Sequence, residues 1–499
     1  MLRDAVNKSP WCTLRTGCTV VGRPSEDPPT VEYRDDKCGS HLIRGQWLVG
    51  ADGKVGVVRK HFLETAAGIR QEEGRYRYNG TWVAANLKIS LPTPESHPEW
   101  PLWELAYTPE QAYDLFWPKG WHFCSPPGKP TATGRFGPHG ARLWRHEFRQ
   151  ETAYENKDLE QLLWEHLRPM ITRDRGEDGT RFQSSIQFPV DCITVLRCEP
   201  FRFTHKVVNK WYDKRTILVG DAAHVFPPFA GQGIASGLRD AHQLGWRLAL
   251  LVDKRQSSME PMANANVLLE SWVAERRYSV ADAAFFSTII GKLCNNQISL
   301  LVAMLLSIFA FLERKGLLPR AANPQSRQER NGFMAVPGGF FIKGNGGGVR
   351  IAQIPLFENR QGLAVLSDAI LRESRSIFTL LVVQAPSEGE KPYRDAKEAV
   401  RLAEIRDDAL SEHSIRVYCT ETTIANASPP NESSLRTYSP SVGESVGESH
   451  NRTYTDRLGH ATKFAIIRPD LFIFATARDA VELGESLASL KRQLEDRFT

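Results

Sequence analysis

The stretch Val219–Ala241, VGDAAHVFPPFAGQGIASGLRDA, combines a carboxylate with rigid prolines and small glycines in a short space. Asp221 directly follows RTILVG, an apolar run at 215–220 that is typical of a buried parallel strand. In open α/β sheets, ligands bind beyond the carboxyl ends of such strands. A carboxylate at that place can accept hydrogen bonds from the hydroxyls of a sugar or polyol.

The residues after this strand predict a rigid turn that leads into a helix. Pro227 and Pro228 stiffen the turn, and Gly231 and Gly233 let the backbone approach a flat ligand with no Cβ in the way. A helix is expected to begin near Gly233, where its free N–H groups and positive dipole end would stabilise an anion. A generic strand–turn–helix is the alternative, but the ordered pattern extends over about twenty residues, so we expect a cradle for a polyol joined to an anionic ring system.

Charge and cysteine content exclude several classes of protein. Lys and Arg number 63 and Asp and Glu 58, a net charge of +5 with no basic tract, so we expect no nucleic-acid partner. The 8 cysteines include no C-x-x-C pair, and the first residues contain no apolar signal segment. These features favour a reduced, cytoplasmic protein without a metal site.

Composition divides the chain into five zones. The uncharged run Ile298–Leu312 falls short of a membrane span, and a packed or partner-facing helix is favoured there over contact with a membrane surface. The zone after 355 predicts a small α/β unit, in which KFAIIRPDLFIFATA at 463–477 is expected as one strand. The zones are 1–75 and 206–325 as two parts of one domain, 76–205 as an inserted β-sheet domain, 326–355 as a linker, and 356–499 as the C-terminal unit with a disordered insert at 426–452.

Three motifs resemble those of the flavin-dependent aromatic hydroxylases, the class A monooxygenases. The stretch at 219–241 is similar to the family's second FAD-binding motif, G-D-A-A-H-x-x-P-P-x-x-G-Q-G-x-N-x-G-x-x-D-A. WLVGADGKVGVVRK at 47–60 resembles its Asp-Gly motif, and LLESWVAERRYSV at 268–280 its Y-x-x-E-R helix. The C-terminal zone is similar to the thioredoxin-like domain of phenol hydroxylase and 3-(3-hydroxyphenyl)propionate hydroxylase. The implied fold is α/β and α+β: a partial Rossmann-like FAD domain, an inserted β-sheet substrate domain and a thioredoxin-like domain.

The resemblance implies FAD as cofactor, NADH or NADPH as co-substrate, and hydroxylation of a phenolic or other aromatic substrate. Baeyer–Villiger or decarboxylative oxidation uses the same motifs and stays open, as does a homodimer. Two departures stand out: Ala235 replaces the family's Asn, and Gly56 replaces its Ser, which is expected to weaken that turn. The residues implied to bind FAD are Asp52, Gly53, Gly220, Asp221, Pro228, Gly231, Gln232, Gly233, Ile234 and Ala235.

No catalytic residue is assigned by the sequence. His122, His146 and His205 lie in or beside the expected substrate domain, where a histidine can act as a base toward a phenol near neutral pH. For each of them a structural role is the more economical interpretation. His224 is expected to hold the turn rather than to carry protons.

The largest departure from the family is that no strand with G-x-G-x-x-G opens the sequence. The run GNGGG at 344–348 follows no expected strand and is assigned to the linker. About a hundred residues are expected to be missing, through a misplaced gene start, a split gene or a partner chain. Residues 1–499 alone are therefore expected to bind FAD poorly and to expose a sheet edge. The alternative function is a truncated, inactive fragment that needs a partner chain.

Overall fold

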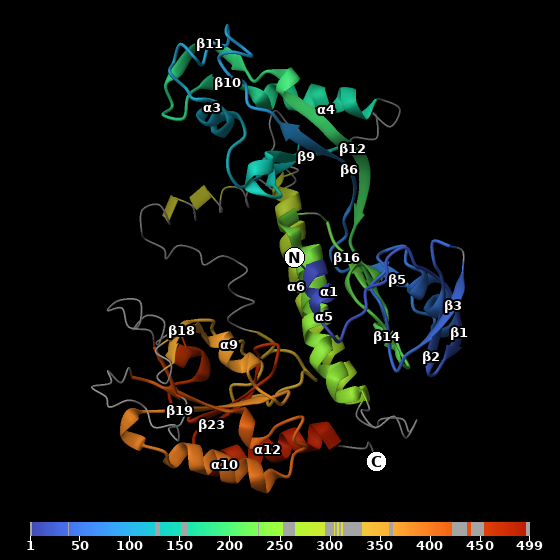
Figure 1. Ribbon diagram of the computed structural model, residues 1–499, viewed down its shortest axis with the longest axis vertical. Helices are drawn as coiled ribbons and strands as arrows, with labels where there is room; N and C mark the ends of the chain where they lie inside the picture. The colour runs from blue at the N-terminus through green and yellow to red at the C-terminus, as the bar shows by residue number, and fades with distance from the viewer. Residues whose placement is uncertain are drawn as a thin grey trace. The chain divides into compact units, whose positions relative to one another are not determined.

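In the computed structural model, which describes most of the residues, the chain forms two compact units (Figure 1). One unit comprises 1–235 and 282–317, and the other 236–281 and 318–499. The described residues are 2–37, 39–124, 130–150, 158–227, 229–252, 265–294, 304, 307–308, 311–312, 332–358, 363–421, 437–440 and 454–495.

The zones 1–75 and 206–235 form three small sheets, two of which contain strands from both zones. One is antiparallel, in the order β1-β2-β3; in the second, β14-β15-β4, β15 pairs in parallel with β4; the third has the order β16-β13-β5. The elements are α1 (Leu2–Lys8), β1 (Thr19–Glu26), β2 (Pro29–Arg34), β3 (Ser40–Arg44), β4 (Leu48–Gly50), a π-helix (Val58–Leu63), α2 (Glu64–Ala67), β5 (Gln71–Glu73), β13 (Lys206–Val208), β14 (Tyr212–Asp213), β15 (Thr216–Leu218) and β16 (His224–Val225).

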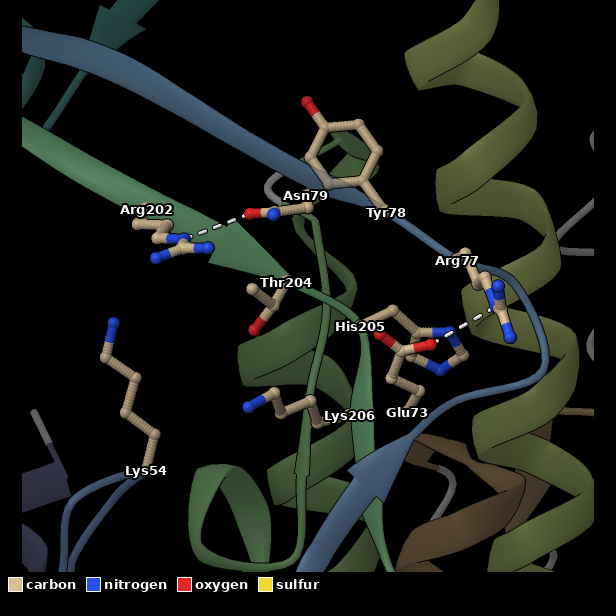
Figure 2. Close-up of a pocket in the computed structure, with 9 residues that line it drawn as sticks. All are labelled: Lys54, Glu73, Arg77, Tyr78, Asn79, Arg202, Thr204, His205 and Lys206. Carbon is tan, nitrogen blue, oxygen red and sulfur yellow. Dashed lines mark hydrogen bonds and ion pairs between the residues drawn. The ribbon is translucent and has the colours of Figure 1, made fainter.

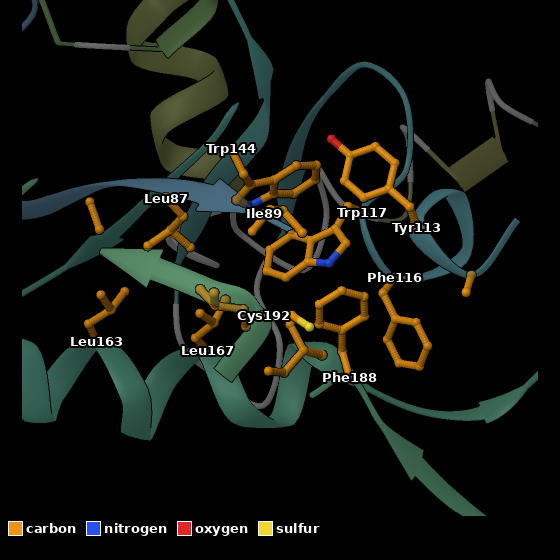
Figure 3. Close-up of a cluster of buried hydrophobic side chains, with 14 of the residues drawn as sticks. Leu87, Ile89, Tyr113, Phe116, Trp117, Trp144, Leu163, Leu167, Phe188 and Cys192 are labelled. Atoms are coloured by element: carbon orange, nitrogen blue, oxygen red, sulfur yellow. The ribbon is translucent and has the colours of Figure 1, made fainter. Parts of the chain in front are cut away.

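A five-stranded antiparallel sheet, in the order β12-β6-β9-β8-β7, lies between these segments in the sequence. Helix α3 begins with a capping box, in which Thr108 and Gln111 each accept the other's backbone N–H. Side chains from the sheet and from α4 bury a core rich in tryptophan and phenylalanine (Figure 3). The elements are β6 (Asn79–Ile89), α3 (Pro109–Phe116), β7 (Trp121–Cys124), β8 (Thr131–Phe136), β9 (Leu143–Arg149), α4 (Leu159–Leu167), β10 (Thr172–Arg175), β11 (Arg181–Gln187) and β12 (Ile193–Thr204).

The second unit contains a seven-stranded sheet in the order β18-β17-β21-β20-β19-β22-β23. All six residues of β19 are buried, as expected of a central strand, and α10 joins β19 to its parallel neighbour β20. The elements are β17 (Pro355–Glu358), β18 (Leu363–Leu366), α9 (Ser367–Arg372), β19 (Thr379–Gln384), α10 (Lys391–Ala403), β20 (Ile415–Cys419), β21 (Thr437–Pro440), β22 (Phe464–Ile467), β23 (Ile473–Ala477) and α12 (Ala480–Glu495).

Three expectations for the C-terminal half need correction. The run at 463–477 forms two antiparallel strands, β22 and β23, because the chain turns at 468–472, where Leu471 has a positive φ of 69°. Within the insert 426–452, expected to be disordered, residues 437–440 form β21 and pair with both β17 and β20; the rest of that insert lies outside the described residues. The expected linker is packed from 332 onward, with Phe333, Val336 and Phe341 buried against Phe472.

Two long helices, α5 (Gln232–Leu251) and α6 (Ala265–Cys294), follow the turn at 227–231. The start of α5 agrees with the helix expected near Gly233. Among the described residues, no helix is both long and apolar enough to cross a membrane. The run at 298–312 is described only at 304, 307–308 and 311–312, so its packed or partner-facing helix stays a prediction.

Candidate functional site

Two adjacent parallel strands bring the Asp-Gly turn and Asp221 to one edge of a sheet. Leu218 of β15 pairs with Gly50 of β4, and the Val219 N–H donates to the Gly50 carbonyl at 3.0 Å. A Cβ on Gly50 would come within 2.8–2.9 Å of the Val58 and Leu218 side chains, so this close approach needs glycine. Asp52 and Asp221 therefore follow the carboxyl ends of neighbouring strands, where ligands of such sheets bind.

Asp221 presents an exposed carboxylate from a tight turn. It lies in the 3-10 turn Gly220–Ala222, in which Gly220 has a positive φ of 58°. The Gln71 side-chain amide donates to the Asp221 backbone carbonyl at 3.1 Å and so ties β5 to this turn. The carboxylate itself has no hydrogen-bond partner among the described residues, and it is free to accept bonds from a ligand.

The Asp-Gly turn is ordered by the Asp52 carboxylate. Asp52 Oδ2 accepts the backbone N–H of Val58 at 2.9 Å, at the start of the π-helix, and Gly53 has a positive φ of 80°. Arg59 is buried and donates to the Lys54 carbonyl at 2.6 Å. These two hydrogen bonds support the turn, and the expected weakening of it by Gly56 stays a prediction.

The turn before α5 is held by α6 and by an aromatic cluster. Ser287 Oγ lies 3.0 Å from the Pro227 carbonyl and 3.1 Å from the Phe229 carbonyl. Phe229 is fully buried and meets the rings of Tyr78 and Trp82 edge to face. Pro228 lies outside the described residues.

The first residues of α5 leave open space for a ligand. Gly231 has a positive φ of 61°, and an added Cβ there or on Gly233 would meet no atom within 4 Å. Gln232 is buried, Ala235 is half-buried, and the apolar side chain of Ile234 is 82% exposed. A flat ligand at this helix start would find backbone N–H groups and apolar surface together.

A cavity of about 560 Å³ lies where β6 begins and β12 ends (Figure 2). The sequence analysis did not predict this cavity. Lys54, Arg202 and Lys206 lie on one side of it, and the ion pair between Arg77 and Glu73, 3.2 Å long, on the other. Four cations against one carboxylate make this cavity suited to an anionic group. Its lining is Lys54, Glu73, Arg77, Tyr78, Asn79, Arg202, Thr204, His205 and Lys206. The positive charge of Lys54, directly after the Asp-Gly pair, was the one feature of the sequence that could have indicated this cavity.

Of the three candidate histidine bases, His205 lines this cavity. Its Nδ1 lies 2.8 Å from the Tyr76 carbonyl, and its ring stacks on Phe226. Burial lowers the pKa of His205, which the Tyr76 carbonyl partly opposes, so the ring favours its neutral form. His122 is half-buried on β7, and His146 is fully buried and bonded to His166, so neither is placed in the cavity. His224 is buried with its ring near those of Trp211 and Phe226, which agrees with a role in holding the turn.

The Glu-Arg pair of the third motif forms buried ion pairs instead of facing a ligand. Arg276 Nε donates to Asp240 at 2.6 Å. Glu275 accepts from Arg247 at 3.0 Å and from Arg468 at 2.7 and 2.8 Å. Burial opposes ionisation of Glu275, but the two arginines outweigh it and lower its pKa to about 2.

Comparison with known sequences identifies a family. Residues 1–278 match the family model described as FAD binding domain. The chain is 26% identical over 280 residues to a probable NADH-specific resorcinol 4-hydroxylase of Rhodococcus jostii (strain RHA1), covering 55% of this chain and 42% of that protein. It is 24% identical over 298 residues to a 3-(3-hydroxy-phenyl)propionate/3-hydroxycinnamic acid hydroxylase of Paraburkholderia xenovorans (strain LB400), covering 59% and 38%. The chain thus spans about two fifths of the length of these relatives.

Comparison with solved structures identifies the fold. Aklavinone-11 hydroxylase, solved with FAD and aklavinone, matches with a TM-score of 0.58 at 15% identity, covering 97% of this chain and 74% of that one. The flavin-dependent monooxygenase PieE, solved with FAD and substrate, matches with a TM-score of 0.60 at 16% identity, covering 99% and 78%. At these identities the likeness shows the fold alone.

Proposed function

Because this chain belongs to the FAD-binding-domain family of the flavin-dependent aromatic monooxygenases, we propose that it hydroxylates a phenolic or other aromatic ring with FAD, NAD(P)H and O2. The observation that carries this proposal is the juxtaposition of Asp52 and Asp221 at the carboxyl ends of the parallel strands β4 and β15. These two residues come from separate motifs, about 170 residues apart in the sequence, that serve one cofactor in the family.

The residues present fit the ribityl and ring end of FAD. The exposed Asp221 carboxylate can accept ribityl hydroxyls, and the open start of α5 at Gly231–Gly233 can face the anionic edge of the ring system. The Asp52 carboxylate is bonded to Val58, so the backbone of Asp52 and Gly53 is the part that can contact the cofactor. FAD held there would supply the transfer of one oxygen atom from O2 to the aromatic ring, with electrons from NAD(P)H.

The cation-lined cavity gives the chain's own residues a binding role. Lys54, Arg202 and Lys206 can hold a carboxylate of the substrate or a phosphate of the nicotinamide nucleotide. One relative is named as a hydroxylase of a carboxylate-bearing phenol, and the other as NADH-specific, which supports both assignments. The inactive-fragment alternative receives no comparable support.

The C-terminal unit is proposed as thioredoxin-like. Its strand order β20-β19-β22-β23 supports this, because β19 is parallel to β20 and antiparallel to β22, with α10 linking the parallel pair. The sequence contains no C-x-x-C, so its role would be structural. The five-zone division, the cytoplasmic location and the homodimer remain predictions.

The test begins with flavin binding by the full chain, measured up to high FAD concentrations because the sequence predicts weak binding. The protein is titrated with FAD, and binding is followed by quenching of flavin fluorescence. Asp221→Ala is expected to weaken binding about ten- to hundredfold, since a charge-assisted hydrogen bond is worth roughly 1.5–3 kcal/mol. Asp213→Ala, on neighbouring β14, is the matched control. Equal affinity of the Asp221→Ala and parent proteins would remove Asp221 from the site.

Turnover is then measured as NADH and NADPH oxidation in the presence of resorcinol or 3-(3-hydroxyphenyl)propionate, with product identification by mass. A product heavier by one oxygen atom, with the ring intact, supports hydroxylation. Ring expansion or loss of CO2 would indicate the Baeyer–Villiger or decarboxylative alternative. FAD binding without oxidation stimulated by any phenol would contradict the proposed activity.

A further inference from the structure

Three metal-binding side chains converge in the substrate domain, in a group separate from the residues that line the cation-rich cavity. His97 lies in a turn before α3, and Asp191 and Cys192 lie in the 3-10 turn that precedes β12. His97 Nε2 is 3.1 Å from Asp191 Oδ2 and 3.8 Å from Cys192 Sγ. The three ligand atoms all lie within 4.8 Å of one another.

We propose that His97, Asp191 and Cys192 form a binding site for a divalent zinc-class cation. A tetrahedral Zn²⁺ forms bonds of about 2.0–2.1 Å to N, about 2.0–2.2 Å to O and about 2.3 Å to S. With these bond lengths, an N and an O ligand lie about 3.4 Å apart, and an N and an S ligand lie about 3.6 Å apart. The observed separations of 3.1–3.3 Å and 3.8 Å differ from these by only a few tenths of an ångström. The donor set of imidazole, carboxylate and thiolate is one that zinc prefers.

The imidazole is held in the orientation that a metal ligand needs. His97 Nδ1 lies 2.8 Å from Ser96 Oγ, which leaves Nε2 directed toward Asp191 and Cys192. Such a hydrogen bond to the second ring nitrogen is the usual support of a metal-bound histidine. The His97 backbone is fixed at both ends, since its N–H donates to the Thr93 carbonyl at 2.8 Å and its carbonyl accepts from Trp103 Nε1 at 2.6 Å.

The thiol and the carboxylate differ in environment in a way that suits metal entry. Cys192 is buried among the residues of the aromatic core (Figure 3), and its carbonyl accepts the Ser90 N–H at 2.8 Å. The Asp191 side chain is 76% exposed, which gives a path from solvent and room for water as the fourth ligand.

The competing interpretation is a surface ion pair between His97 and Asp191, with Cys192 as an ordinary core residue. That arrangement needs no metal, and it predicts that Zn²⁺ binds no better to the parent protein than to a variant without the thiol. The sequence did not predict a metal site because His97 and Asp191 are separated by 94 positions and follow no ligand-spacing motif.

The test uses the full chain after removal of metals with a chelator. Zn²⁺ is titrated in competition with a chromophoric chelator, and Co²⁺ is added as a spectroscopic substitute. We expect one tight site per chain and a near-ultraviolet absorption band from a cobalt–thiolate bond. Cys192→Ser should abolish this band, and His97→Gln and Asp191→Asn should each weaken Zn²⁺ binding about tenfold or more.

The matched controls are Cys198→Ser, a half-buried cysteine near the same core, and Cys12→Ser, an exposed one. Both should keep the band and the affinity. Circular dichroism checks that each variant folds, and the exposed position of Asp191 makes Asp191→Asn informative even where Cys192→Ser fails to fold. Absence of the cobalt–thiolate band in the parent, or Zn²⁺ affinity unchanged in Asp191→Asn and His97→Gln, would overturn the proposal.

Discussion

At position 56 the lack of a side chain determines where the Asp52 carboxylate lies. A Cβ on Gly56 would come 2.1–2.5 Å from the carboxylate atoms of Asp52, closer than any real contact allows. The carboxylate uses that space to accept the Val58 N–H. The absence of a side chain at position 56 therefore lets the Asp52 carboxylate support this turn.

Gly56→Ala is expected to displace Asp52 and to destabilise the protein by about 1 kcal/mol, the net value of a partly exposed hydrogen bond. Urea unfolding followed by circular dichroism measures the change. Gly140→Ala is the control, because a Cβ there meets no atom within 4 Å. Equal midpoints for the two variants would show that the Asp52–Val58 bond contributes nothing.

At the scale of elements, strands β8 and β9 and helix α4 share a buried chain of hydrogen bonds. It runs from Thr133 through His146 and His166 to Thr131, with separations of 3.2, 2.9 and 3.3 Å. All four side chains are buried, and the His166 ring stacks on Phe148. The chain fixes the last turn of α4 against the sheet. His146 is thereby a structural residue, as the sequence interpretation favoured.

The stability of this packing should depend on pH. Burial, followed by the neighbouring His166, holds the pKa of His146 well below 6.5. The unfolded chain then binds a proton that the folded chain excludes, so stability is full above about pH 6.5 and falls as the pH drops below that value. We expect a loss of at least about 1 kcal/mol between pH 7.5 and pH 5. Urea unfolding of His146→Gln should show a shallower pH dependence, whereas exposed His139→Gln should keep that of the parent.

A fully buried ion-pair network joins α5, α6 and the turn between β22 and β23. Its members are Arg247, Glu275, Arg468 and Asp470. Glu275→Gln would leave Arg247 and Arg468 without their shared carboxylate. We expect a loss of about 3–5 kcal/mol, measured by denaturant unfolding, because an uncompensated buried charge is costly. Glu482→Gln, in an exposed ion pair with Arg478, should change little. A comparably small effect of Glu275→Gln would mean that water or a rearranged side chain replaces the carboxylate.

The sequence predicted elements well where local pattern and packing agree. The strand before Asp221 and the start of α5 lie close to where the local sequence pattern predicted them. The sequence did not predict the elements whose position depends on contacts between residues far apart in the chain. Residues 437–440 carry no strong strand signal, yet they lie between β17 and β20, and the break between β22 and β23 is a single turn in a continuous apolar run. The cation-lined cavity and the His97 group join residues distant in sequence, which no spacing rule detects.

At the scale of the whole molecule, charge should select among aromatic substrates. The chain carries a net charge of +5, and its largest local excess that we describe is the cavity of Lys54, Arg77, Arg202 and Lys206 around a single carboxylate. A positive field of this kind raises the encounter rate with anions, and salt screens it because the Debye length falls to about 10 Å at 0.1 M.

We therefore expect kcat/KM for a phenol with a carboxylate to fall about threefold or more between about 20 mM and 500 mM NaCl, while kcat/KM for a neutral phenol of similar size changes little. Both assays use the same nicotinamide nucleotide at saturation, so salt affects that anion equally in the two assays. The ratio of the two kcat/KM values therefore reports the effect of salt on the phenol alone. Lys206→Gln and Arg202→Gln should lower the salt dependence for the anionic phenol, and Lys391→Gln, on exposed α10, should not. If the ratio of the two kcat/KM values is independent of salt, the cavity does not take the substrate's anionic group, and the phosphates of the nicotinamide nucleotide become its better occupant.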